Sequence, residues 1–194
     1  MTKNTLLNIA IIISRIVKVL FVITAIAITS LYIYVQLDNN LFAEKQIMIS
    51  KPVISNNYFS YFISGSETYQ GLEKGENPFT VSQIEALSLF IYYIKILIVL
   101  LLSFIALNSF EKIILSVKKL ETFSLKNVKR FRKIGFCILI LFFLEGYTVI
   151  RFEYGMQKAI AFNYSSLIYV LIIFIVAEIF KEGYALQQEN ELTI

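Results

Sequence analysis

Lysine and glutamate residues inside long apolar stretches are the clearest chemical signal in this chain. Its 194 residues include no histidine and one cysteine, Cys137. Without histidine there is no Ser-His-Asp triad and no histidine metal site, and a single cysteine forms no internal disulfide. The ionisable residues in apolar surroundings are Lys95, Glu145 and Glu178. Inside a membrane such groups either relay protons or ions, or form ion pairs that fix neighbouring helices.

The absence of histidine and the mostly aliphatic residues between the levels of Glu145 and Glu178 favour ion pairs over a relay. At a rise of about 1.5 Å per residue, Lys95 and Glu145 lie about 12 Å and about 9 Å below the same outer boundary. We expect them to pair, because an unpaired charge costs at least about 2.5–3.5 kcal/mol at the bilayer centre. Glu178 lies near the inner boundary, at a depth similar to that of Lys18 and near that of Arg15, and a second pair is predicted there. No catalytic residue, cofactor or metal is predicted, and we do not expect an enzyme.

The composition identifies the environment of these charges. Hydrophobic residues make up 57% of the chain, charged residues 16%, and the mean hydropathy is +0.70. A soluble domain is about 45–50% apolar and about 25% charged. One core surrounded by water cannot bury this excess, so the composition predicts an integral membrane protein.

Four apolar stretches are long enough to cross the membrane as helices, which takes roughly 20 residues each. Continuous runs of this length favour helices over strands. The sequence therefore predicts an all-α membrane protein, a single domain (1–194) built as a four-transmembrane-helix bundle. The predicted spans are residues 19–36, 86–108, 134–150 and 162–180, with an outer loop 38–85, a basic inner loop 111–133 and a tail 181–194.

The basic residues orient the predicted bundle. The inner loop, 111–133, carries eight lysines and arginines against two glutamates. Because cytoplasmic loops are enriched in basic residues, we expect this loop and both termini to be cytoplasmic. Basic side chains beside the inner leaflet also favour contact with anionic lipid headgroups.

The two long loops carry different patterns. In the outer loop, β-prone runs on both sides of Asn56-Asn57 predict a hairpin, which serves either as a small ligand-binding cap or as a plain connector. In the inner loop, apolar residues at helical spacing continue the second span, Thr122 and Phe123 interrupt them, and Ser124 is placed to cap a new helix. The inner loop either sets topology beside lipid or docks a cytoplasmic partner. Direct nucleic-acid binding is not expected, because no DNA-reading motif is present.

Two motifs resemble a known family. One is the C-terminal run Phe180–Ile194, and the other combines Phe123-Ser124 with Asn127–Gly135. Together they are similar to bacterial four-span membrane proteins called the domain of unknown function 2975 family. The resemblance implies no established enzyme activity. It also implies a membrane partner for a small helix-turn-helix transcription regulator, which is encoded beside many members.

Residues and resemblance together predict a non-enzymatic membrane regulator, or anchor, in the bacterial cytoplasmic membrane. Its inner loop and tail are expected to bind a cytoplasmic helix-turn-helix regulator. The alternative is a small transport or channel component that uses the intramembrane charges, and a homo-oligomer is compatible with either function. The predicted partner-binding residues are Lys129, Arg130, Arg132, Lys133, Glu182, Gly183, Glu189, Asn190, Glu191, Leu192, Thr193 and Ile194.

Overall fold

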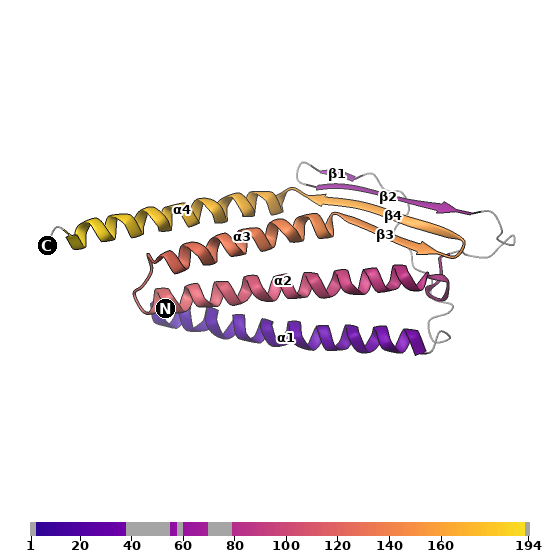
Figure 1. Cartoon of the computed structure of the whole chain (residues 1–194), viewed down its shortest axis with the longest axis horizontal. Helices are drawn as coiled ribbons and strands as arrows, with labels where there is room; N and C mark the ends of the chain where they lie inside the picture. The colour runs from indigo at the N-terminus through magenta and orange to yellow at the C-terminus, as the bar shows by residue number, and fades with distance from the viewer. Residues whose placement is uncertain (1–2, 38–54, 58–59, 70–78, 193–194) are drawn as a thin grey trace. The chain divides into compact units, whose positions relative to one another are not determined.

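The computed structural model describes residues 3–37, 55–57, 60–69 and 79–192. This part of the chain is mostly helical (Figure 1). In chain order its elements are α1 (Lys3–Leu37), β1 (Ser55–Asn57), β2 (Ser60–Thr68), the 3-10 helix η1 (Val81–Gln83), α2 (Ala86–Lys118), α3 (Leu125–Glu145), β3 (Tyr147–Phe152), β4 (Gly155–Asn163) and α4 (Ser165–Leu192).

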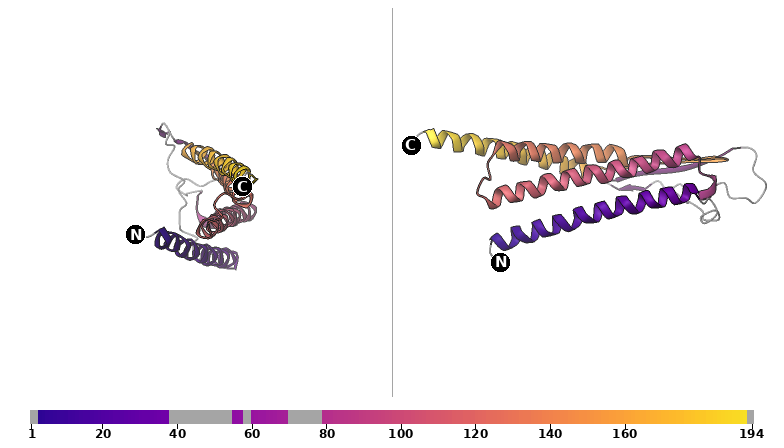
Figure 2. Two further views of the ribbon diagram at one scale, coloured as in Figure 1. Left: turned by 90° about the vertical axis from the view of Figure 1, so that its left-hand side faces the viewer. Right: turned by 60° about the horizontal axis from the view of Figure 1, so that its bottom comes forward.

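The chain forms two compact units. The first, here called the helical unit, consists of Met1–Ile23, Leu100–Leu141 and Ser165–Ile194. The second, the sheet unit, consists of Thr24–Val99 and Phe142–Tyr164. Helices α1 and α2 contribute to both units, and Figure 2 shows them again in two further views.

Two helices are long and apolar enough to cross a membrane. These are Thr5–Leu37 in α1 and Ala86–Lys118 in α2, each 33 residues long. At about 1.5 Å per residue each reaches about 50 Å, which exceeds the roughly 30 Å of a hydrocarbon layer. Many apolar side chains of α1 are exposed, among them Val19 and Ile26. So much exposed apolar surface suits contact with hydrocarbon better than contact with water.

The predicted third and fourth spans were wrong in extent. Residues 134–150 are helical only as far as Glu145, and residues 162–180 only from Ser165, because β3 and β4 form a hairpin between them. The apolar helical stretches that remain, 134–144 and 165–177, measure about 16 Å and about 20 Å at the usual helical rise. Crossing with four helices therefore stays a prediction, and the all-α class is corrected to helices with a sheet.

The sheet is antiparallel, with strand order β1-β2-β4-β3 (Figure 1). A hairpin is present near Asn56-Asn57, because Asn57 pairs with Ser60, but the predicted turn at the two asparagines is wrong, since both belong to β1. The runs at 47–54 lie outside the described residues. β3 and β4 meet at a two-residue turn, where buried Phe152 pairs with Gly155 and packs edge-on against Phe79.

Gly155 fits against the backbone of β2, and this gives a test of the strand register. A Cβ at Gly155 would lie 2.5 Å from the carbonyl oxygen of Glu67, whereas a Cβ at Gly65 would meet nothing within 4 Å. Gly155→Ala should therefore lower the free energy of unfolding by about 1–3 kcal/mol, since a backbone atom cannot swing aside. Gly65→Ala, the matched control, should be close to neutral. Thermal unfolding in detergent, followed by circular dichroism, measures both, and equal losses would contradict the pairing of β2 with β4.

Candidate functional site

The turn between α2 and α3, residues 119–124, is held closed by Asn127 in the helical unit. This side chain is fully buried, and its Nδ2 donates to Ser116 Oγ and to the carbonyl of Thr122, each at 2.9 Å. Its Oδ1 accepts a hydrogen bond from Arg130 Nη1, which also donates to the carbonyl of Lys112. The last carbonyls of a helix have no partner within the helix. One amide therefore joins the end of α2, the turn and the start of α3.

The start of α3 lies where the sequence predicted it. The carbonyl of Ser124 accepts hydrogen bonds from the backbone N–H groups of Asn127 and Val128, at 2.9 and 3.2 Å. Ser124 Oγ lies 3.4 Å from the nitrogen of Asn127, the position of an N-cap side chain.

Leu120 occupies an unusual backbone conformation at the end of α2. Its φ is 63°, which is in the left-handed region, and its side chain is 83% exposed. This conformation costs an L-residue other than glycine roughly 1–2 kcal/mol. It is imposed by the turn, in which the N–H of Leu120 donates to Val117 and the N–H of Glu121 donates to Ser116. An apolar side chain is thus presented outward from a strained position.

Aromatic contacts join this turn to α4. The ring of Phe180 lies 5.4 Å from that of Phe123 and 4.7 Å from that of Phe131, measured between centroids. Gly183 leaves room for Phe123, because a Cβ there would lie 2.4 Å from the ring. The two segments that carry the family resemblance therefore pack against each other.

Unpaired cations surround the turn. Within the described ranges, the side-chain ammonium groups of the exposed lysines Lys119, Lys126 and Lys129 make no hydrogen bond or ion pair. Arg130, by contrast, is engaged with Asn127 and Lys112 and has a structural role.

The other predicted partner-binding residues lie along α3 and α4. Arg132, Lys133 and Glu182 are exposed, and Gly183 is half-buried beneath Phe123. Glu189 and Asn190 are exposed on the last turns of α4. Glu191 and Leu192 belong to the same helix, and Thr193 and Ile194 lie outside the described residues.

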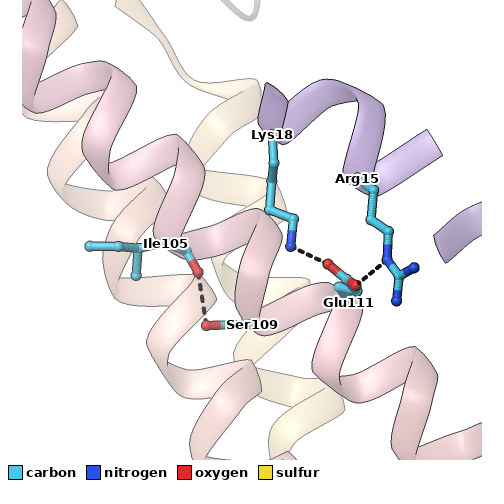
Figure 3. A network of polar contacts seen from close by, with 5 residues as sticks. All are labelled: Arg15, Lys18, Ile105, Ser109 and Glu111. Carbon is cyan, nitrogen blue, oxygen red and sulfur yellow. Dashed lines mark hydrogen bonds and ion pairs between the residues drawn. The ribbon is translucent and has the colours of Figure 1, made fainter. Parts of the chain in front are cut away.

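Glu111 is the buried centre of a charge cluster in the helical unit (Figure 3). The side chain is 8% exposed and accepts hydrogen bonds from Arg15 Nε at 3.0 Å and from Lys18 Nζ. Both cations come from α1, so the cluster joins α1 to α2. The predicted partner of Lys18, Glu178, instead pairs with Arg132 and Lys181, and these three side chains are about half exposed. Sequence reasoning missed Glu111 as a partner because it counted this residue with the inner loop.

The side chain of Lys95 forms hydrogen bonds with the edge strand of the sheet. Its Nζ donates to the carbonyl of Tyr147 at 2.8 Å and to Thr148 Oγ1 at 2.9 Å, both on edge strand β3. Seven residues earlier on α2, Ser88 Oγ accepts the N–H of Arg151 at 3.0 Å. Within the described part of the chain, the predicted ion pair between Lys95 and Glu145 is absent, and Glu145 acts on the ammonium only as a nearby charge. The ammonium of Lys95 therefore binds a backbone carbonyl and a threonine hydroxyl in place of the predicted carboxylate of Glu145.

A cavity of about 650 Å³ lies within the sheet unit. It is lined by Ile28, Leu31, Tyr32, Val35, Phe62, Val81, Ile84, Ser88, Leu89, Tyr92, Tyr93, Ile96, Thr148, Ile150, Ala159 and Ala161, from α1, α2, the sheet and the segment before α2. Among the described residues, no charged side chain lines this cavity. Among residues 3–37, 55–57, 60–69 and 79–192, no cluster of histidine, cysteine, aspartate or glutamate could hold a metal ion.

Comparison with known families gives one match. The family described as "Protein of unknown function (DUF2975)" matches residues 67–194, about two thirds of the chain. The chain belongs to the DUF2975 family. Neither the curated proteins nor the solved structures gave a match. The matched part includes the α2–α3 turn, both segments of the resemblance, and the β3–β4 hairpin that sequence reasoning missed in this DUF2975 protein.

The two charge clusters of the helical unit should differ in their effect on stability. Glu111→Leu should lower the free energy of unfolding by about 2–3 kcal/mol, because it leaves Lys18, whose side chain is only 18% exposed, without its ion-pair partner. Adding Lys18→Met should recover part of this loss. Glu178→Leu should cost much less, because water screens an exposed pair. Unfolding midpoints in detergent provide the comparison, and equal costs at the two glutamates would show that burial of Glu111 does not matter.

The hydrogen bonds of Lys95 give a second test. Lys95→Met should lower the free energy of unfolding by about 1–3 kcal/mol, because it leaves an edge carbonyl unsatisfied. A double-mutant cycle of Lys95→Met with Thr148→Val should be clearly non-additive. The cycle of Lys95→Met with Glu145→Gln should show the weaker coupling. Stronger coupling of Lys95 to Glu145 than to Thr148 would contradict these hydrogen bonds and support the predicted ion pair.

Proposed function

We propose that this protein is a non-enzymatic membrane anchor whose α2–α3 turn binds a cytoplasmic helix-turn-helix transcription regulator. The observation that carries the proposal is Leu120, an apolar side chain presented to the surroundings at positive φ among unpaired lysines. Family membership adds support through the regulators encoded beside many members.

Leu120 has the properties of an anchor for a protein partner. Its side chain is almost entirely exposed, so it contributes little to the fold of its own chain, while its backbone conformation favours glycine or asparagine. A residue in a strained conformation whose apolar side chain is left exposed is a candidate for function. Burying one large side chain in a pocket of the partner would stabilise a complex substantially.

The lysines define the charge of the partner's contact face. Lys119 precedes Leu120 in the turn, and Lys126 and Lys129 lie on the first turns of α3. Their positive charge favours an acidic surface of the partner. They repel the basic surface with which a helix-turn-helix protein approaches DNA. The regulator would therefore bind through an acidic face and leave its DNA-binding face free. Enrichment of basic residues on the cytoplasmic side supports the same location for the turn.

Leu120→Asn is the decisive variant. Asparagine tolerates the left-handed conformation, so the variant should be as stable as the natural protein or slightly more so. It should nevertheless bind the helix-turn-helix protein encoded beside its gene at least about tenfold more weakly. Binding of the purified proteins in detergent, measured by biolayer interferometry, gives the affinity. Leu87→Asn is the matched control, because Leu87 is 65% exposed and belongs to the sheet unit.

Charge reversal tests the lysines. The pair Lys126→Glu and Lys129→Glu should weaken the complex, and the loss should shrink as salt is raised. Arg151→Glu, an exposed cation in the sheet unit, should leave the affinity unchanged. Membrane insertion is checked for each variant, because basic residues also set topology. Unchanged affinity in Leu120→Asn and in the lysine pair would overturn the proposal.

A further inference from the structure

We propose that the cavity of the sheet unit binds one acyl chain of a phospholipid, with Lys95 at the cavity edge holding the lipid phosphate. This site is independent of the proposed contact with a regulator, which involves the helical unit. No residue of the α2–α3 turn lines the cavity.

The lining of the cavity selects for hydrocarbon. Its volume of about 650 Å³ falls within the usual range for ligand pockets, about 300–1,000 Å³. Aliphatic side chains from α1, α2 and the sheet form most of the wall, and none of the described residues that line it is charged. A charged group placed inside without a partner would lose its hydration, so the part of the ligand that enters is uncharged.

Three of the five hydroxyl groups in the cavity wall already bind other groups of the protein. The hydroxyl of Tyr93 lies 3.1 Å from Thr29 Oγ1, Ser88 Oγ accepts from Arg151, and Thr148 Oγ1 accepts from Lys95. Few hydrogen-bonding atoms are therefore left to orient a polar metabolite. Tyr32 and Tyr93 stack with centroids 4.3 Å apart and give the wall a flat aromatic face. Such a wall holds a chain by contact and exclusion of water.

Lys95 supplies charge complementarity at the edge. Its Nζ contacts Thr148, which lines the cavity, but the ammonium itself is not part of the wall. An ammonium has three N–H donors, and within the described residues Lys95 uses two of them, on Tyr147 and Thr148. The third is available to a phosphate oxygen, for which charge-assisted hydrogen bonds are favourable.

The source of the ligand follows from the elements that form the cavity. Two of its walls belong to α1 and α2, the helices that are long and apolar enough to cross a membrane. The cavity is partly open. A lipid of the surrounding bilayer can therefore enter sideways, with its chain in the cavity and its phosphate at Lys95.

Native mass spectrometry of the full-length protein tests this assignment. The protein is stripped of lipid in detergent, and dioleoyl phosphatidylglycerol or dioleoylglycerol is then added as the probe. The two probes share their acyl chains and differ in the phosphate. We expect one phosphatidylglycerol molecule bound per chain, and dioleoylglycerol retained several-fold less.

Ala161→Phe places a large ring in the cavity from β4 and should reduce the retained lipid by about tenfold or more. Ala86→Phe is the matched control, because Ala86 is exposed in the same unit and does not line the cavity. If Ala161→Phe fails to fold, Ile28→Trp fills the cavity from α1.

Equal retention by the natural protein, the filled variant and the control would mean that lipid adheres to the helix surface, and this would overturn the proposal. Equal retention of the two probes would overturn the role given to Lys95. Absence of bound lipid in the natural protein would overturn both. Binding of the regulator is measured separately, and the lipid proposal stands or falls without it.

Discussion

The closed turn between α2 and α3 depends on one buried amide, that of Asn127. Its donors and acceptor reach the end of α2, the turn itself and the first turn of α3, so no single hydrophobic side chain could replace it. The turn in turn places Phe123 against Phe180 and fixes Leu120 at positive φ. If the amide were lost, the carbonyls of Glu121 and Thr122 in the turn would need water, and the arrangement of exposed leucine and lysines would no longer be fixed.

The same requirement, a partner for every polar group in apolar surroundings, explains the other polar residues of the two long helices. Glu111 is buried because α1 brings two cations to it, and Lys95 and Ser88 are retained on α2 because the edge of β3 needs a donor and an acceptor. An open sheet edge beside lipid would be costly. Lys95 thus has a structural role, whereas its position in an apolar stretch had suggested relay or ion-pair chemistry.

The sequence was informative where one pattern had one structural solution. The long apolar runs of α1 and α2, the break near Ser124 and the hairpin after Asn57 could all be predicted. The β3–β4 hairpin could not, because an apolar run is compatible with helix and strand alike, and no Asn-Gly marks its turn. Gly146 followed by β-branched Thr148, Val149 and Ile150 was the available signal. The missed hairpin also explains the wrong partner of Lys95, since a strand edge took the place of a helix neighbour. The positive φ of Leu120 has no signature in the sequence.

Hydrogen–deuterium exchange tests the central claim most directly, namely that the α2–α3 turn is the surface that meets a protein partner. The full-length protein in detergent is compared with and without the purified helix-turn-helix protein that is proposed as its partner. The amides of residues 118–126 should exchange more slowly in the complex, while those of the β3–β4 hairpin keep their rates. Protection elsewhere, or unchanged exchange across the turn while the two proteins are bound, would contradict this account.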